Sequence, residues 1–366
     1  MKQHPAGQLL LVGVPGTELD ADTAALYRRV QPGGFIIFGR NIIAAAQLRK
    51  LIDDLRDVSE VEPIITIDQE GGRVSRLRLI GNEPPSAQEL REKGDETLVS
   101  RHGHITGRLL RLFGFNLDLC PVLDISFDDE ADNSLRGRCY GNNVEQVVRL
   151  AGAFNRALRG EGIASCGKHF PGYSAAELDA HHDLPKIERS REQLEREELA
   201  VFRQFVTAVD SMMICHGWYP SFDREKLPAS LSPTVVKELL RSELKFGGLV
   251  MTDDLDMGAI YNEYGLEQTI RMALGAGNDL AMICHRIDAI AQARDTIAAL
   301  PAAALEGALQ NVARFKAGIS PPHPFSESAF RQLDEEVWKL RVEVLGAERA
   351  AERSPEDGKR SPVETY

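Results

Sequence analysis

Two groups of polar residues could carry out chemistry in this sequence, and each directly follows a short apolar run. The first begins with residues 168–172 (KHFPG), after the run GIASCG, and continues to Asp179 and His181. The second is residues 252–257 (TDDLDM), after the run GGLVM. Barrel and doubly wound enzymes keep their catalytic residues where buried strands end and loops begin. Both groups are therefore candidate parts of an active site.

Together the two groups fit hydrolysis of a glycosidic bond with retention, which needs a nucleophilic carboxylate and a proton donor. Asp253 is the candidate nucleophile because it ends a predicted strand. Asp179 and His181 are two residues apart, so in an extended chain their side chains point the same way. The aspartate can then bind one ring nitrogen while the other moves a proton. Histidine suits that role near neutral pH, since its unperturbed pKa is about 6.5.

A metal site is the competing interpretation of Asp253 and the histidines. The candidate ligands are His102, His104, His169, His181, His182 and His216. Metal-dependent barrels usually carry paired histidines on an early strand, whereas the first apolar run here ends in glycine and proline. His102 and His104 lie in a helical pattern with no matching strand. We therefore expect no metal and no cofactor.

Eight apolar, β-rich runs alternate with amphipathic helical patterns along the chain. The runs are residues 8–14, 34–39, 63–68, 116–125, 163–169, 211–217, 247–254 and 279–285. Near-continuous apolar strands between helices are typical of a parallel sheet covered on both faces. Eight such units predict a single (β/α)8 barrel of the TIM type, with its active site at the C-terminal ends of the strands. A doubly wound open sheet is the alternative, but no Gly-x-Gly-x-x-Gly follows the first run.

Polar residues follow six of the eight runs, as a barrel active site requires. They are residues 68–73, Asp124, residues 168–169, residues 216–218, residues 253–254 and His285. A single aspartate or histidine at a strand end is more often a cap or a structural residue, but six together are harder to explain that way. Carboxylates with Lys, Arg and His around one opening suit a neutral, hydroxyl-rich ligand, because each charged group strengthens its hydrogen bond to a hydroxyl.

Composition excludes other classes of protein. The chain has 366 residues, 43% of them hydrophobic and 27% charged, which allows a large core. Its net charge of −12 argues against a nucleic-acid binder. No segment approaches the roughly 18 apolar residues of a membrane span, and the N-terminus does not resemble a secretory signal. Five cysteines, an odd number, fit reduced thiols. We expect a cytoplasmic monomer that binds neither nucleic acid nor membrane.

One domain accounts for most of the chain. Residues 1–345 are predicted to form the barrel with extra C-terminal helices, because helical patterns continue after residue 285. Residues 346–366 are polar and rich in Pro, Ser and charge, so we expect a mobile tail with no core of its own.

Several motifs between about residues 8 and 285 resemble glycoside hydrolase family 3, in its branch of β-N-acetylglucosaminidases typified by the bacterial peptidoglycan-recycling enzyme. They are PGGFIIFGRNI, IDQEGGRVSRL, RGRCYG, GKHFPG followed by DAH, PASLSP, GGLVMTDDLDMGAI and AGNDLAMICH. The combination of Lys-His-Phe-Pro-Gly, Asp-x-His and Asp-Asp-Leu-x-Met is highly specific. The resemblance implies a single (β/α)8 barrel without the second domain of larger relatives.

The resemblance also implies roles for individual residues. Asp253 would be the nucleophile, His181 the general acid/base and Asp179 its orienting partner. The positions that would hold the sugar are Asp68, Arg76, Arg138, Lys168 and His169. The implied enzyme is a retaining exo-β-N-acetylglucosaminidase that acts on muropeptide fragments of peptidoglycan in the cytoplasm without a cofactor.

Three departures from the family pattern lie near the implied site. Residues 173–174 are Tyr-Ser where the family usually has His-Gly, although the spacing to His181 is kept. Residues 139–140 are Cys-Tyr where Ser-Phe is common, and Thr252 replaces the usual serine while keeping a hydroxyl.

Other activities are alternatives on the sequence alone. One is a phosphorylase, because a histidine acid/base does not repel an incoming phosphate as a carboxylate would. Another is a catalytically silent sugar-binding barrel, which would be expected to lose Asp253, Asp179 or His181, yet all three are present. A β-glucosidase or β-xylosidase is disfavoured by the Asp-x-His pair.

Overall fold

The computed structural model describes residues 5–131, 133–174 and 184–354. Eight parallel strands close into a barrel in the order β1-β10-β9-β8-β7-β6-β3-β2. They are β1 (Leu10–Gly13), β2 (Gly34–Ile37), β3 (Ile64–Ile67), β6 (Leu117–Asp118), β7 (Ala164–Phe170), β8 (Ser211–Ile214), β9 (Leu249–Asp254) and β10 (Leu280–Ile283). Each coincides with one of the eight predicted runs, and only β7 extends beyond its run, by one residue, so the (β/α)8 prediction is confirmed.

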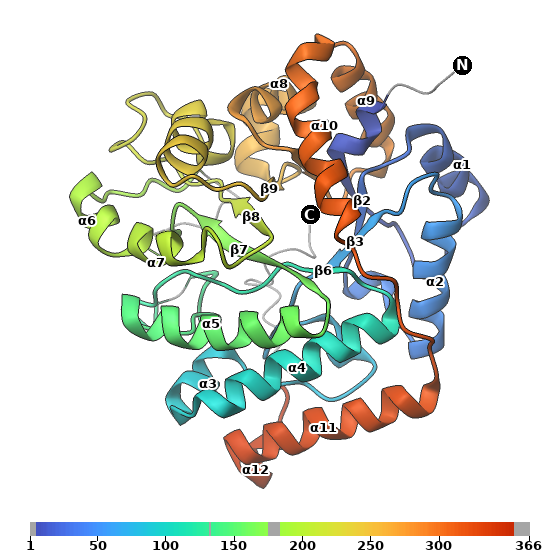
Figure 1. Ribbon diagram of the computed structural model, residues 1–366, viewed down its shortest axis with the longest axis vertical. Coiled ribbons are helices and arrows are strands. Elements are labelled where there is room, and N and C mark those ends of the chain that lie inside the picture. The colour runs from blue at the N-terminus through green and yellow to red at the C-terminus, as the bar shows by residue number, and fades with distance from the viewer. Residues whose placement is uncertain (1–4, 132, 175–183, 355–366) are drawn as a thin grey trace.

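Helices surround these strands and run mostly along the outside of the barrel (Figure 1). They are α1 (Ala21–Val30), α2 (Ala45–Asp57), α3 (Ala87–Lys93), α4 (Glu96–Phe113), α5 (Val144–Gly160), α6 (Arg191–Arg196), α7 (Glu198–Phe205), a π-helix (Thr234–Glu243), α8 (Gly258–Ala276), α9 (Ile290–Ala298), α10 (Ala302–Ala317), α11 (Glu327–Leu345) and α12 (Ala347–Ala350). Side-chain caps start several of them; the Asn143 side chain, for example, accepts from the Gln146 amide at the start of α5.

The chain departs from its sequence pattern in two places. The pattern of residues 191–209 predicts one helix. In the structure the backbone angles of Glu197 are not helical (φ −116°, ψ −88°), so α6 and α7 are separate helices. Arg189 forms ion pairs with both Glu197 and Glu198 at this break. A short antiparallel hairpin of β4 (Gln69–Gly71) and β5 (Val74–Ser75) also follows β3, where the sequence indicated only a polar loop.

Helix α4 packs closely on α5, and α11 covers the outer side of α4 (Figure 1). Gly103 allows the α4–α5 contact, since a Cβ atom there would lie 2.5 Å from the carbonyl oxygen of Phe154. After α11 the chain turns back toward the barrel. Arg341 donates to the carbonyl of Ala350 (3.0 Å), and the Ser354 hydroxyl donates to Glu83 (2.6 Å). The start of the predicted tail therefore contacts the barrel, while residues 355–366 lie outside the described residues.

None of the helices that the structure describes is both long enough and apolar enough to cross a lipid bilayer.

His102 on α4 predicts how stability depends on pH. The side chain is 1% exposed, and burial lowers its pKa to about 4. The unfolded chain therefore binds a proton between about pH 4 and 6.5 that the folded chain does not, so stability is present at neutral pH and is lost as the pH falls through this window. We expect His102→Leu to reduce the difference in the free energy of unfolding between neutral and acidic pH by up to about 3 kcal/mol.

Urea unfolding at pH 7.5 and 4.5 measures the difference. His104→Leu is the matched control, because His104 lies two residues further along the same helix, on its exposed face. An unchanged pH dependence in His102→Leu would contradict the prediction.

Candidate active site

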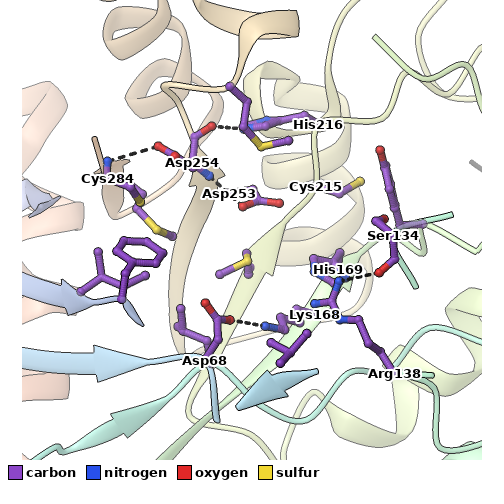
Figure 2. Close-up of a pocket in the computed structure, with 18 of the residues that line it drawn as sticks. Asp68, Ser134, Arg138, Lys168, His169, Cys215, His216, Asp253, Asp254 and Cys284 are labelled. Atoms are coloured by element: carbon purple, nitrogen blue, oxygen red, sulfur yellow. Dashed lines mark hydrogen bonds and ion pairs between the residues drawn. The ribbon is translucent and has the colours of Figure 1, made fainter. Parts of the chain in front are cut away.

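A cavity lies at the C-terminal ends of the barrel strands, and charged side chains from several strands meet in it (Figure 2). The predicted residues that line it are Asp68, Arg76, Arg138, Lys168, His169 and Asp253. The other two predicted residues, Asp179 and His181, lie outside the described residues. Barrel closure therefore brings together side chains from β7, from β9 and from the segment after β3, which are far apart in the sequence.

Asp253 belongs to β9, and its carboxylate points into the cavity (Figure 2). The Asp254 amide donates to its Oδ1 (2.8 Å). Burial raises the pKa of Asp253, but the positive potential of His216 and His169, this amide and the Lys168 ammonium together outweigh burial and hold the pKa below its usual value. The carboxylate is therefore ionised at neutral pH, the state that a nucleophile needs.

Lys168 is the centre of a buried charge cluster on the other side of the cavity. It is 1% exposed, and its Nζ lies 2.5 Å from Oδ1 of Asp68 and 2.8 Å from Oε1 of Glu70. Arg138 binds both oxygens of Glu70, at 2.8 and 2.7 Å. Burial raises the pKa of Glu70, but Arg138 and Lys168 lower it by more, so the net shift is downward. Glu70 is therefore ionised, and a hydroxyl bound at this cluster would meet strong donors and acceptors.

Arg76 reaches the cavity because of the β4–β5 hairpin. Gln69 ties the hairpin together, since its side-chain amide donates to the Ser75 hydroxyl (2.7 Å) and its carbonyl accepts from the Leu77 amide (3.1 Å). This contact fixes the short 3-10 helix Arg76–Leu79. The Arg76 guanidinium then lies 3.9 Å from Oδ2 of Asp68 and over the ring of Phe38.

His169 is oriented by Asp124, which is fully buried. Oδ2 of Asp124 accepts from the backbone amide of His169 (3.1 Å) and lies 2.7 Å from its Nδ1. Since a carboxylate accepts, Nδ1 carries a proton and Nε2 remains for a ligand. Oδ1 of Asp124 accepts from the Tyr173 amide (2.7 Å).

The residues that differ from the family pattern lie in or against this site. Tyr173 lines the cavity, with its ring 6.2 Å from the ring of His169. Cys139 and Tyr140 are buried. The Thr252 hydroxyl accepts from the Met282 amide (3.1 Å) and so ties β9 to β10.

The described residues on either side of residues 175–183 make hydrogen bonds at the active-site end of the barrel. Before them, the Ser174 hydroxyl accepts from the Ile125 amide (2.9 Å). After them, Trp218 donates to the carbonyl of Pro185 (2.8 Å) and accepts from the Ile187 amide (2.8 Å). These flanks follow β7 and adjoin the loop after β8.

Sequence reasoning noted Glu70, Asp124 and His216 as polar residues after strands but did not include them among the site residues. Their position directly after strands indicated that they could belong to the site. The local sequence pattern, however, does not show whether Asp68 or Glu70 contacts the distant Lys168. Among the described residues, no group of three or more His, Cys, Asp or Glu side chains is arranged to hold a metal ion.

Glu70→Gln tests the charge cluster. The substitution keeps the volume but leaves Lys168 and Arg138 with one carboxylate fewer, so we expect a loss of roughly 3 kcal/mol in the free energy of unfolding. Glu130→Gln is the matched control, because Glu130 pairs with Arg136 (2.7 Å) and its side chain is 81% exposed. That surface pair should contribute less than about 1 kcal/mol. Equal losses in urea unfolding would contradict the assignment.

Comparison with known proteins agrees with this fold. Residues 3–315 match the family described as Glycosyl hydrolase family 3 N terminal domain. The chain is 34% identical over 277 residues to a beta-hexosaminidase of Pseudomonas aeruginosa, covering 75% of this chain and 82% of that protein. It superposes on a glycoside hydrolase family 3 beta-N-acetylglucosaminidase from Paenibacillus sp. str. FPU-7 with a TM-score of 0.86 and 33% identity, covering 94% of this chain and 69% of that chain.

It is similar also to native NagZ from Neisseria gonorrhoeae, with a TM-score of 0.78 and 28% identity, covering 91% of this chain and 97% of that one. The family match covers well over half of the chain, and the fold and the site motifs agree with it. The chain therefore belongs to glycosyl hydrolase family 3 and is a glycoside hydrolase.

Proposed function

We propose that this enzyme is a retaining exo-β-N-acetylglucosaminidase that removes terminal N-acetylglucosamine through a covalent glycosyl-enzyme. The observation that carries the proposal is Asp253, an ionised carboxylate near the C-terminal end of β9 that points into a cavity lined by charged side chains. The names of its relatives, a beta-hexosaminidase and a beta-N-acetylglucosaminidase, support the choice of sugar.

In the first step the Asp253 carboxylate attacks the anomeric carbon while His181 donates a proton to the leaving oxygen, so the glycosidic bond breaks as the ester bond forms. In the second step His181 takes a proton from water, and the resulting hydroxide displaces Asp253. Asp179 would hold the other ring nitrogen of His181. Asp253 is free again at the end, and the product keeps its anomeric configuration.

The five remaining predicted residues would hold the sugar in the position for attack. The cluster of Lys168, Asp68, Glu70 and Arg138 presents fixed charges rather than mobile water, and fixed groups lose little freedom when a hydroxyl binds. His169 would contribute its Nε2. Arg76 would contact the ligand beside Asp68.

The proposed natural substrate is a muropeptide fragment of peptidoglycan, hydrolysed in the cytoplasm without a cofactor. Five free, buried cysteines support a reducing compartment. We also predict that the enzyme is a monomer.

Asp253→Asn removes the nucleophile while keeping the side-chain volume. We expect turnover of 4-nitrophenyl N-acetyl-β-glucosaminide to fall by at least roughly a thousandfold with the melting temperature little changed. Asp295→Asn, at an exposed carboxylate on α9, is the control. Full activity of Asp253→Asn would overturn the proposal.

The same assay, repeated with the β-glucoside and with added phosphate, separates the alternatives. Phosphate-independent turnover of the acetamido sugar alone supports the hydrolase. Strong acceleration by phosphate, with sugar 1-phosphate as product, would assign a phosphorylase instead. If the wild type hydrolysed neither glycoside, the remaining alternative would be a sugar-binding barrel without catalytic activity.

His181→Ala tests the proton donor. 4-Nitrophenolate leaves without protonation, so kcat/KM for the 4-nitrophenyl glycoside should fall much less than kcat/KM for a natural disaccharide. For both substrates kcat/KM reports the step in which the glycosidic bond breaks. Equal losses on both substrates would contradict the acid role.

A further inference from the structure

Asp254, the second carboxylate of the aspartate pair, joins the nucleophile to the neighbouring strand. We infer that Arg40 and His285 act on Asp253 through Asp254 and are positioning residues of this enzyme. The inference rests on the proposed role of Asp253 and extends it to residues that lie outside the predicted site.

Asp254 holds the end of β9 in place through both its backbone and its side chain. Its amide donates to Asp253 and its carbonyl accepts from Nε2 of His216 (2.8 Å; Figure 2). Its Oδ1 accepts from the amides of Asp256 (3.0 Å) and Cys284 (3.2 Å). A movement of Asp254 would therefore move the nucleophile, which is its direct neighbour.

The protonation state of His285 follows from Arg40. Nη1 of Arg40 lies 2.9 Å from Nδ1 of His285. A guanidinium only donates, so Nδ1 must accept and the proton of the neutral ring lies on Nε2. That nitrogen lies 3.4 Å from Oδ2 of Asp254. At this distance the ring and the carboxylate make no hydrogen bond, but the N–H dipole attracts the carboxylate and so favours Asp254 in its ionised form.

Asp254 needs this support because it is 4% exposed. Burial and then the nearby Asp256 carboxylate raise the pKa of Asp254 well above its usual range, while the backbone amides oppose them. Without the N–H of His285, Asp254 would take up a proton more readily. A neutral Asp254 would be a weaker acceptor for the amides that tie β9 to β10.

Arg40 is itself fixed, so it can define the orientation of His285. Its Nε donates to the carbonyl of Val14 (3.0 Å) and its Nη2 to the carbonyl of Cys284 (2.6 Å). The guanidinium also stacks on the ring of Phe38, at 4.6 Å from the centroid. Gly13 leaves room for it, since a Cβ atom there would lie 2.9 Å from Nη2.

The first test compares two substitutions of His285. In His285→Gln the side-chain amide can still present an N–H near the position of Nε2, whereas His285→Met has a similar length and no donor. We expect His285→Met to lower kcat roughly 10- to 100-fold with KM changed less than about threefold. His285→Gln should recover most of the lost kcat.

An equal loss of kcat in the two variants would show that His285 acts only through the packing of its ring on Phe38 (centroids 5.2 Å apart) and not through its N–H. That result would overturn the inference. No loss in either variant, or a change confined to KM, would overturn the inference too. If Asp253→Asn retained activity, the proposed function would fail instead, so the two failures are distinguishable.

A second measurement does not depend on turnover. The 15N chemical shifts of His285, assigned by comparison with His285→Gln, report which ring nitrogen carries the proton. We expect the neutral ring with its proton on Nε2 at neutral pH, and a change to protonated Nδ1 in Arg40→Met. A proton on Nδ1 in the wild type would overturn the inference.

Discussion

The ammonium group of Lys168 is buried at the C-terminal end of the barrel, and much of the site depends on the need to neutralise it. A buried cation is stable only beside carboxylates with good geometry. Asp68 and Glu70 supply them from the segment after β3, where Glu70 belongs to β4, and Arg138 balances Glu70 from the long loop after β6. Three segments of the chain are therefore joined by charge pairing at one side of the cavity.

The opposite side of the cavity contains two neighbouring carboxylates whose pKa values are shifted in opposite directions. The pKa of Asp253 is lowered because His216, His169, the Asp254 amide and Lys168 outweigh burial, whereas the pKa of Asp254 is raised by burial next to Asp256. Adjacent residues of one strand point to opposite faces, so neighbours in sequence enter different environments. One carboxylate can react with a substrate while the next is enclosed in the structural network of Arg40 and His285.

Three histidines illustrate how partners decide chemical roles. Asp124 places a proton on Nδ1 of His169 and leaves Nε2 for the cavity, whereas Arg40 requires the opposite tautomer of His285. His102, which has neither kind of partner among the described residues, is neutral and lowers stability in acid. Residue type alone does not distinguish these three cases.

The sequence by itself determined the strands, most helices and the end of the barrel that carries the site. Apolar runs and helical periodicity are local properties, and a parallel barrel places every C-terminal strand end at the same face. The motifs named Asp253 and Lys168 for the same reason, since each sits directly at the end of an apolar run. The hairpin of β4 and β5 and the break at Glu197 were not visible, because they depend on particular side-chain contacts, of Gln69 with Ser75 and Leu77 and of Arg189 with Glu197 and Glu198, that apolar periodicity does not report.

Only the tertiary structure decided which polar groups meet. Arg40 and His285 are 245 residues apart, and Lys168 and Asp68 are 100 apart. Closure of β1 onto β10 brings the first pair together, and the passage from β3 through β6 to β7 brings the second. Charge neutralisation, proton placement and pKa shifts act over a few ångströms in space, so they become defined only when the barrel has closed.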